Sequence, residues 1–227
     1  MSDWLAADWD APRQIVAGTS LRGADKAALP LPGLPCWLKQ VHGANVVTAG
    51  HFDEPPEADA SVKGSDPFSD VSKKGSEPFL CVVRTADCLP VLMCSKDGGA
   101  FAAAHAGWRG LAAGVIENTI VALDIDPANL LVWLGPAISQ AAFEVGDEVR
   151  EVFLVHDPKA SSCFERNARG RWQADLYGLA RQRLNAAGVL AVTGGEYCTY
   201  SDEKRFYSYR RNPDCGRLVS FIDLLTP

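Results

Sequence analysis

The residues best suited to chemistry are two histidines and one cysteine that stand in short, distinctive segments. His42 lies in QVHG, Cys88 in TADCLP and His105 in AHAGWRG. Each falls at an expected strand end, and a glycine near each histidine leaves room for a ligand to approach the backbone. Catalytic zinc takes three protein ligands and keeps a fourth position open, whereas structural zinc is closed by four. The three residues therefore predict one catalytic transition-metal site, with zinc as the expected ion.

The case for this site rests on the three residues together. A lone histidine is usually a hydrogen-bonded core or surface residue, and a lone cysteine at a strand end is usually a small buried hydrophobe. The chain has four histidines in all, and two of them fall in glycine-flanked turns. His51 and His156 lie in ordinary polar surroundings and are interpreted as residues without a role in the site.

Three arginines are candidates for holding an anion. Arg109 stands near the expected start of a helix, where a guanidinium and free N–H groups suit a phosphate or a carboxylate. A solvated surface arginine is the competing interpretation. Arg210 and Arg211 follow an aromatic segment, YSY, and form a second candidate. For this pair the competing interpretation is a basic turn packed beside aromatic rings.

Two further residues flank the expected ligands. Asp87 precedes Cys88 and is a candidate base, or a residue that orients a metal-bound water. Its competing role is to hydrogen-bond the turn that contains it. Gln40, two residues before His42, is a candidate for substrate binding.

The bulk composition is that of a folded protein without external staples. The chain has 227 residues, of which 47% are hydrophobic and 22% charged. A chain of this length buries a sizeable core unaided, so a metal site is expected to be functional. The net charge of -6 argues against general nucleic-acid binding, which needs a basic face. Small-molecule substrates are expected instead, and the composition leaves the oligomeric state open.

The cell compartment is predicted from the cysteines and the chain's first residues. The seven cysteines are odd in number and form no CxxC pair, which is typical of a reducing compartment. The first ten residues, MSDWLAADWD, have neither the basic nor the apolar region of a secretory signal. No apolar run reaches the roughly 18 residues that a membrane span needs. A cytoplasmic protein without a membrane anchor is therefore expected.

Strands and helices are expected to intermix without a regular βαβ order, which favours an α/β or α+β fold of mixed sheets. Hydrophobic patterning predicts helices over 111–123, from about 147 with Val149, Val152 and Phe153 facing inward, and over 175–187 with Gly188 after its end. Extended segments are expected at 37–41, 46–47, 79–83, 90–93, 99–105, 130–134, 206–209 and 217–222.

A single domain over 1–227 accommodates these elements. Its first part, 1–35, is weakly patterned and contains prolines that would break a helix. An inserted loop is expected over 61–79, within a stretch rich in acids, Pro, Gly and Ser, and it holds the near-repeat KGSDPF and KGSEPF. Two copies cannot build a solenoid, so an inserted surface loop is the interpretation.

The common signatures of nucleotide binding, esterases and zinc proteases are absent. There is no GxxxxGK[ST], GxGxxG, GxSxG or HExxH, nor the HxE and PCxxC of zinc deaminases. What remains resembles the YfiH family, described as laccase-like polyphenol oxidases and as purine nucleoside phosphorylases. The segments that carry the resemblance are QVHGANVV, TADCLPVL, AHAGWRGLAAGVIENT, LGPAI, FEVGDEV, DLYGLA, FYSYRR and GRLVSFI, in that order over 37–222.

The resemblance implies a compact α/β fold of mixed sheets flanked by helices, similar to certain toxin deamidases. It places the family's metal ligands on His42, Cys88 and His105. It also implies phosphorolysis of adenosine, inosine, guanosine and methylthioadenosine, with deamination of adenosine. The family's longer N-terminal part is represented here by TSLRG at 19–23 alone. Part of the substrate wall is therefore expected to be missing or rebuilt.

Three enzymatic functions remain open at this point, and a module that binds nucleosides without converting them is the fourth alternative. A zinc enzyme acting on purine nucleosides needs phosphate and one open metal position. A copper polyphenol oxidase of the multicopper type needs many more than four histidines, although copper could still occupy the three-ligand site. A metal-free cysteine hydrolase would use Cys88 with His105 as a thiolate–imidazole pair. The same residues serve all three, so only metal analysis separates them.

Overall fold

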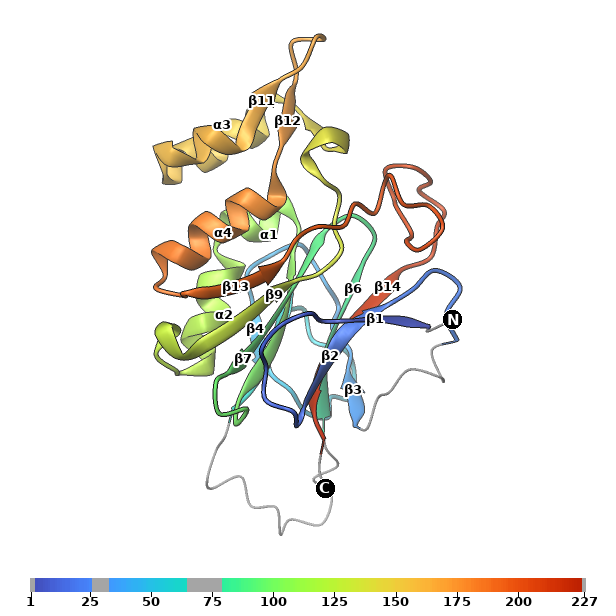
Figure 1. The fold of residues 1–227 in the computed structure, drawn as a ribbon, viewed down its shortest axis with the longest axis vertical. Helices are drawn as coiled ribbons and strands as arrows, with labels where there is room; N and C mark the ends of the chain where they lie inside the picture. The colour runs from blue at the N-terminus through green and yellow to red at the C-terminus, as the bar shows by residue number, and fades with distance from the viewer. Residues whose placement is uncertain (1–2, 26–32, 65–78, 226–227) are drawn as a thin grey trace.

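The computed structural model describes residues 3–25, 33–64 and 79–225 of the chain. Two large sheets pack face to face, a small third sheet lies at one end, and helices cover the outside of one large sheet (Figure 1). This confirms the predicted mixed α/β class. No helix within these ranges is long and apolar enough to cross a membrane.

The six-stranded sheet carries the positions of greatest interest and has the order β13-β9-β7-β8-β5-β4. Its strands are β4 (Val46–Thr48), β5 (Ala60–Lys63), β7 (Leu89–Ser95), β8 (Phe101–Ala106), β9 (Leu130–Leu134) and β13 (Ala191–Gly194). The pairs β4/β5 and β9/β13 are parallel, and the other pairs are antiparallel. Every residue of β7 and β8 is buried, as in strands that are covered on both faces.

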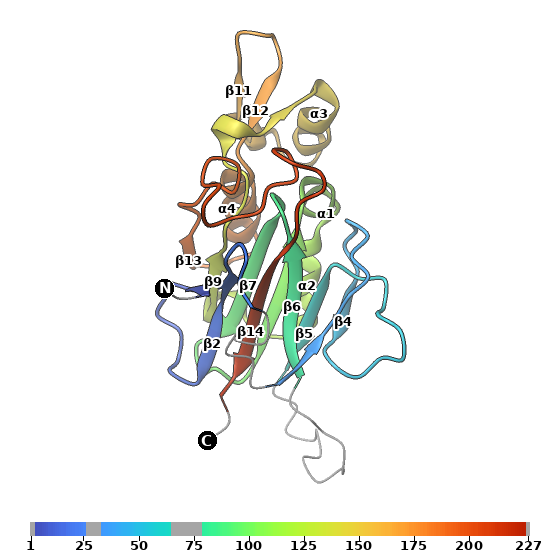
Figure 2. The same ribbon diagram turned by 90° about the vertical axis from the view of Figure 1, so that its right-hand side faces the viewer.

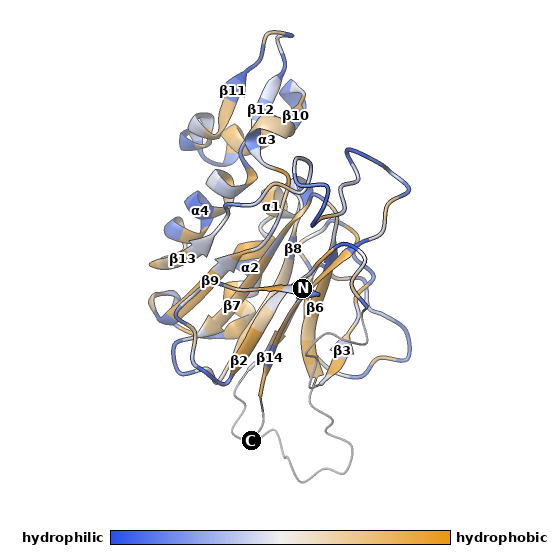
Figure 3. Cartoon of the chain, turned by 45° about the vertical axis from the view of Figure 1, so that its right-hand side comes forward, coloured by the Kyte–Doolittle hydropathy of each residue, from blue (hydrophilic) through white to orange (hydrophobic). Residues whose placement is uncertain are grey.

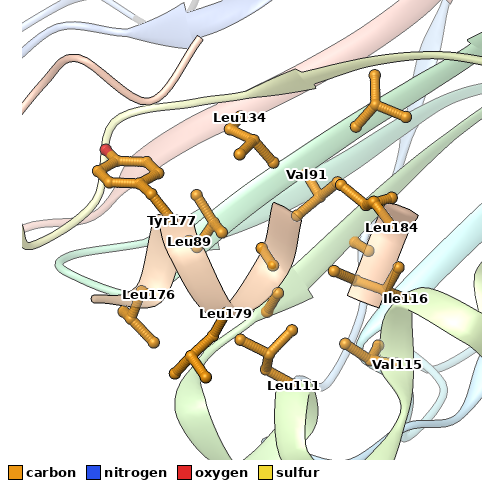
Figure 4. Close-up of a cluster of buried hydrophobic side chains, with 14 of the residues drawn as sticks. Leu89, Val91, Leu111, Val115, Ile116, Leu134, Leu176, Tyr177, Leu179 and Leu184 are labelled. Atoms are coloured by element: carbon orange, nitrogen blue, oxygen red, sulfur yellow. The ribbon is translucent and has the colours of Figure 1, made fainter. Parts of the chain in front are cut away.

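Three helices cover one face of this sheet: α1 (Trp108–Ala113), α2 (Val115–Leu123) and α4 (Leu176–Ala186). Their apolar sides meet those of the strands in one continuous core. Figure 4 shows the side chains concerned, which are Leu89, Val91 and Leu134 from the sheet and Leu111, Val115, Ile116, Leu176, Leu179 and Leu184 from the helices. Burial of this apolar surface supplies the main force that holds the helices in place.

The five-stranded sheet has the order β1-β2-β14-β6-β3 and lies on the other face of the six-stranded sheet. Its strands are β1 (Trp4–Ala6), β2 (Ile15–Ser20), β3 (Leu34–Cys36), β6 (Phe79–Thr85) and β14 (Leu218–Leu224). Figure 2 looks onto β2, β14 and β6 lying side by side. Phe101, Trp133 and Ile222 belong to the core between the two sheets. Figure 3 shows hydrophobic residues concentrated in the strands and hydrophilic residues along the outer loops.

The third sheet is small and projects beyond one end of the large sheets (Figure 1). It pairs β10 (Glu144–Val145), β12 (Trp172–Ala174) and β11 (Phe164–Arg166), and α3 (Asp147–His156) packs beside it. Short 3-10 helices complete the chain at Pro127–Asn129, Gln140–Ala142 and Pro158–Cys163. This end of the molecule contributes Phe143, Glu144 and Leu176 to the surroundings of the candidate site.

The strongly patterned segments are where they were predicted. Extended structure at 79–83, 90–93, 99–105, 130–134 and 217–222 is confirmed by β6, β7, β8, β9 and β14. The helices expected from about 147 and over 175–187 are confirmed as α3 and α4. Gly188 has φ 94°, the left-handed conformation expected just after a helix end.

The helix expected over 111–123 is two helices that begin earlier, at Trp108. Gly114 separates them with φ 93°, a conformation that a helix interior cannot contain. Hydrophobic spacing missed the break because Leu111, Val115 and Ile116 still face the same core. The inward position predicted for Val152 in α3 is also wrong, since its side chain is 46% exposed.

Predictions for the less regular segments were also wrong. Residues 37–41 form no strand. Their β-type pairing with other described residues is one isolated parallel bridge, between Lys39 and Glu57. Residues 206–208 have no regular secondary structure and residue 209 lies in a turn; the N–H of Phe206 donates to the carbonyl of Asp202, and the carbonyl of Ser208 accepts from the N–H of Asn212, so local bonds replace strand pairing. The inserted loop predicted over 61–79 overlaps β5 and Phe79 of β6, and its portion at 65–78 lies outside the described residues. The weakly patterned region 1–35 contributes β1, β2 and β3.

Candidate metal centre

The three predicted ligands lie together at one end of the six-stranded sheet. Cys88 directly precedes β7, and His105 is the last residue but one of β8. His42 lies four residues before β4. Because β7, β8, β5 and β4 are consecutive in the sheet, the chain brings these three side chains together from distant points in the sequence.

His42, Cys88 and His105 form a tight cluster. Each offers one ligand atom, and the three atoms lie within 4.8 Å of one another. The two imidazole rings are 4.8 Å apart between centroids and nearly perpendicular, at 78°. His42 is exposed, Cys88 is half-buried and His105 is 3% exposed. The cluster therefore has a buried base and one open side.

Asp59 organises this cluster and was not predicted from the sequence. It is fully buried, directly precedes β5, and lies opposite His105 in the antiparallel β5/β8 pair. Its Oδ1 lies 2.8 Å from Nδ1 of His105. The same carboxylate accepts hydrogen bonds from three consecutive backbone N–H groups, those of Val41 at 3.2 Å, His42 at 2.9 Å and Gly43 at 2.6 Å.

These contacts explain how the loop that carries His42 is held without a strand. His42 has φ 59°, a left-handed conformation that is strained for a side chain with a Cβ. The carboxylate of Asp59 accepts hydrogen bonds from the N–H groups of Val41 and Gly43, on either side of His42, and so stabilises the turn. The amide of Gln40 adds a second anchor, since it donates to the carbonyl of Arg84 and accepts from the N–H of Arg84.

The protonation of the cluster follows from these neighbours. Burial alone would raise the pKa of the Cys88 thiol, but hydrogen bonds from His105 and His42 outweigh it and lower the pKa to about 6. Burial alone would lower the pKa of His105, but Asp59 and Cys88 raise it to about 9. The pKa of Asp59 is lowered: His105 and the N–H of Gly43 overcome the effect of burial. At neutral pH Cys88 is therefore a thiolate.

The donor set fits a zinc-type ion. Asp59 accepts the Nδ1 proton of His105, so the proton that an arriving ion displaces is the one on Nε2, which then coordinates, as in carboxylate–histidine pairs at metal sites. A thiolate and two imidazoles are ligands that zinc and copper both accept. Among the described residues, this is the group of three His, Cys, Asp or Glu side chains close enough to hold one ion. His51 and His156 lie outside it.

The absence of a side chain at Gly107 leaves room for the sulfur of Cys88. Cys88 and Gly107 lie opposite each other beyond the paired residues Leu89 and Ala106, and a Cβ on Gly107 would stand 2.8 Å from Sγ of Cys88. Replacing Gly107 with alanine is expected to displace the sulfur and to weaken zinc binding about tenfold or more, since overpacking costs about 1–3 kcal/mol. Competition with a chelating dye measures the affinity.

Gly64→Ala is the matched control, because a Cβ at Gly64 meets no atom within 4 Å. Equal zinc affinities for the wild type and Gly107→Ala would show that the sulfur does not need its present position.

Asp87 connects the cluster to the loop at 198–211. Its Oδ1 accepts from the hydroxyl of Thr199 at 2.6 Å, and its Oδ2 accepts from the N–H of Arg210 at 2.7 Å. Its own φ is 95°, and its carbonyl accepts from the N–H of Ile138 at 2.9 Å. Both carboxylate oxygens therefore serve to hold the loop beside the cluster.

A cavity of about 630 Å³ lies over the cluster. This volume is within the range of roughly 300–1,000 Å³ that small-molecule sites occupy. Seven of the eight predicted site residues line it, namely Gln40, His42, Asp87, Cys88, His105, Arg109 and Arg210. Arg211 does not line it, because its guanidinium donates to the carbonyls of Thr199, Tyr200 and Phe206 within the loop.

The remaining lining residues were not singled out in the sequence. They are Arg84, Thr85, Ala86, Trp108, Ile138, Phe143, Leu176, Tyr209 and Arg217. Several of them lie beside recognised motifs, but their shared cavity depends on the pairing of β6 with β14 and on the placement of the third sheet. Asp59 is an acid directly before a short segment of alternating apolar and polar residues. That pattern points to the site only once β8 is known to be the neighbouring strand.

Fold and site together describe a mixed α/β protein with a His-Cys-His cluster at the end of its central sheet. The sequence profile of the family described as multi-copper polyphenol oxidoreductase laccase matches residues 10–225. The chain belongs to this family, which includes YfiH, as the resemblance implied.

Its similarity to individual proteins is extensive. The purine nucleoside phosphorylase of Pseudomonas aeruginosa is 42% identical over 250 residues, covering 98% of this chain and 98% of that protein. The purine nucleoside phosphorylase YfiH of Escherichia coli is 48% identical over 200 residues, covering 88% of this chain and 77% of that protein. A solved Neisseria meningitidis protein of the DUF152 family has a TM-score of 0.87 at 39% identity, covering 98% of this chain and 99% of that one.

Proposed function

We propose that the protein is a zinc-dependent enzyme of purine nucleosides. It catalyses phosphorolysis of adenosine, inosine, guanosine and methylthioadenosine, and deamination of adenosine. The observation that carries this proposal is the His42, Cys88 and His105 cluster at the base of a cavity sized for a small molecule. Relatives at 42% and 48% identity are named purine nucleoside phosphorylases, which supports the choice of substrate.

His42, Cys88 and His105 would hold the metal ion, with copper as the alternative to zinc. When bound, zinc supplies a Lewis-acid centre with one position free for water or substrate. The chain's own contribution is to fix these ligands before the ion arrives, through Asp59 and the space at Gly107.

Phosphorolysis requires that phosphate and nucleoside meet in one orientation. An oxygen of inorganic phosphate forms a bond to C1′ of the ribose while the C1′–N9 bond breaks, and the purine leaves with the electron pair and takes up a proton. Arg109 and Arg210 line the cavity and supply cationic donors for the anion. Holding the reactants in place is itself a large part of such catalysis.

The purine needs an apolar wall and shielding from water. Trp108, Ile138, Phe143, Leu176 and Tyr209 supply aromatic and aliphatic surface to the same cavity. In deamination, the oxygen of water bonds to C6 of the adenine ring and ammonia leaves. Both reactions therefore need the base held between this wall and the polar end of the cavity.

Asp87 is proposed as a positioning residue in these reactions. Because Thr199 and the backbone of Arg210 occupy its two oxygens, its carboxylate holds the loop that presents the Arg210 side chain. Gln40 acts in the same way on the other side, since its amide is engaged with the backbone of Arg84.

A second candidate function is a metal-free cysteine hydrolase. It is favoured by one observation, the hydrogen bonding of Cys88 with His105 and His42, which lowers the thiol pKa to about 6. A thiolate beside an imidazolium is the arrangement that thiol enzymes use as a nucleophile. Copper-dependent polyphenol oxidation, suggested by the family description, would have to use the single three-ligand cluster.

The test is metal quantitation on protein purified without chelators, combined with assays for free base and for ammonia. We expect stoichiometric zinc, phosphate-dependent release of base from adenosine and inosine, and ammonia from adenosine. Protein that contains no zinc and releases neither base nor ammonia would disprove the proposal. Copper content with oxygen uptake on phenols would favour the oxidase instead.

A further inference from the structure

Four arginines line the cavity over the cluster, although the chain as a whole is acidic. The chain has 28 acidic and 22 basic residues, yet Arg84, Arg109, Arg210 and Arg217 share this cavity with one carboxylate, that of Asp87. Both oxygens of that carboxylate are already engaged. The local excess of positive charge is therefore opposite to that of the whole chain.

None of these four guanidinium groups forms an ion pair with a carboxylate among the described residues. Arginines elsewhere in the fold are neutralised, for example Arg183 by Glu117 at 2.6 Å and Arg205 by Asp202 at 2.5 Å. All four cavity arginines are exposed, so their N–H groups are accessible to a ligand.

Aromatic rings hold the four guanidinium groups instead. Arg84 lies over Trp37 at 5.8 Å, Arg109 over Trp108 at 4.4 Å, Arg210 over Phe143 at 5.5 Å and Arg217 over Tyr209 at 5.6 Å. A ring positions a guanidinium without cancelling its charge, and it leaves the in-plane N–H groups able to donate. This arrangement is suited to reversible binding of an anionic ligand.

Arg84 and Arg217 are a pair created by strand register. Arg84 is directly opposite Val219 in the antiparallel β6/β14 pair, and Arg217 precedes Val219 by two residues. Arg217 directly precedes β14, and the alternation of that strand, continued by one residue, places it diagonally across from Arg84 on the same side; both residues line the cavity. The Arg84 guanidinium donates to the carbonyl of Leu38, and that of Arg217 donates to the carbonyls of Cys215 and Gly216 and to Sγ of Cys215 at 3.8 Å.

We propose that Arg84 and Arg217 form an anion subsite of the cavity that binds a phosphate dianion. Arg109 and Arg210, which belong to α1 and to the loop held by Asp87, lie in the same cavity as additional donors to this anion, and Arg84 and Arg217 are the pair that the subsite adds. Its assignment to the phosphate of the reaction rests on the proposed function. The dianion is either free inorganic phosphate or the phosphate group of a purine nucleotide, and both present the same oxygens to a guanidinium pair.

The experiment measures binding directly, by calorimetry on the full chain, with inorganic phosphate, adenosine and adenosine 5′-monophosphate as probes. Arg84→Gln and Arg217→Gln are expected to weaken phosphate binding about 10- to 100-fold each, since each removes charged hydrogen bonds. Adenosine binding is expected to change little. Arg13→Gln is the matched control, because Arg13 is also exposed but does not line the cavity.

The probes identify the source of the phosphate. Inorganic phosphate that binds alone and is lost in both variants assigns the subsite to the co-substrate. Tighter binding of adenosine 5′-monophosphate than of adenosine, lost in both variants while free phosphate does not bind, assigns it to a nucleotide. Unchanged binding of both anions in Arg84→Gln and Arg217→Gln, or an equal loss in Arg13→Gln, overturns the subsite.

Failure of the subsite and failure of the proposed function give different results. If both variants bind both anions as the wild type does and release base from adenosine with the wild-type KM for phosphate, the subsite is wrong and the proposed function stands. If phosphate binding depends on both arginines but no nucleoside is converted, the subsite stands and the proposed function is wrong. Circular dichroism and Tm of each variant confirm that a loss of binding is not a loss of fold.

Discussion

Replacing Asp59 with asparagine is expected to weaken zinc binding about 10- to 100-fold, the usual effect of removing the partner of a coordinating histidine. Asp59 accepts four hydrogen bonds through two oxygens, from His105 and from the N–H groups of Val41, His42 and Gly43. Asparagine has a single side-chain oxygen, so its NH2 group must face either the donors at Oδ1, which include His105, or those at Oδ2, which include Gly43. Competition with a chelator of known affinity measures the effect.

The side on which the amide turns decides how the site fails. If the NH2 group faces His105, Nδ1 becomes an acceptor and the ring proton moves to Nε2, the atom that must coordinate. If it faces Gly43, two partly buried N–H groups lose their acceptor at a cost of up to about 1–3 kcal/mol each, and the loop around His42 is released. Nitrogen-15 NMR of the histidine rings in the metal-free protein, recorded above the His105 pKa of about 9 so that the ring is neutral, distinguishes the two outcomes.

The control for this variant is Asp53→Asn, which changes a fully exposed acid in a neighbouring segment. Its zinc affinity should equal that of the wild type. A folded Asp59→Asn protein with wild-type affinity and an unchanged His105 tautomer would show that Asp59 has no part in preparing the site.

Cys88→Ala is expected to abolish stoichiometric zinc binding and, with it, release of base and ammonia. The substitution removes one of three protein ligands and the only anionic one, since the thiol pKa of about 6 makes Cys88 a thiolate at neutral pH. The two remaining histidines alone do not provide the three-ligand set that catalytic zinc uses. Elemental analysis of protein purified without chelators, run alongside activity assays, measures both losses.

Cys198→Ala is the matched control because Cys198 is half-buried and also has a lowered pKa. Burial there raises the pKa, but hydrogen bonds from Ser139 and Ser201 outweigh it. This variant should keep its zinc and its activity. A wild-type protein that is active without any metal and is inactivated by Cys88→Ala would instead establish the cysteine hydrolase.

The sequence predicted the site better than it predicted the elements around it. Cys88 and His105 flank strands whose apolar runs are unmistakable, so their placement at strand ends followed directly from local pattern. His42 was assigned to the end of a strand at 37–41 that does not form. The cluster still assembles because Asp59, a residue from another strand, fixes the loop in place of strand pairing.

What escaped prediction depends on contacts between distant parts of the chain. Arg84 and Arg217 become neighbours only through the β6/β14 register, which joins residues more than 130 positions apart. β1 likewise pairs with β2, and β2 pairs with β14, the last strand, so these short segments carry no strong signal of their own. The break at Gly114 preserves the apolar side of the helix and is therefore invisible to periodicity.

Cys88 and His105 are held by paired strands, whereas His42 is exposed and sits on a loop joined to the fold mainly by hydrogen bonds to Asp59 and Arg84. A bound ion leaves by losing its ligands one at a time, and the least anchored ligand detaches first. Metal exchange is therefore expected to proceed through His42, with a barrier set by this loop and not by unfolding of the sheet. An ion held by these three residues would then exchange while the sheet stays folded, and its identity would follow the metals that the surroundings offer.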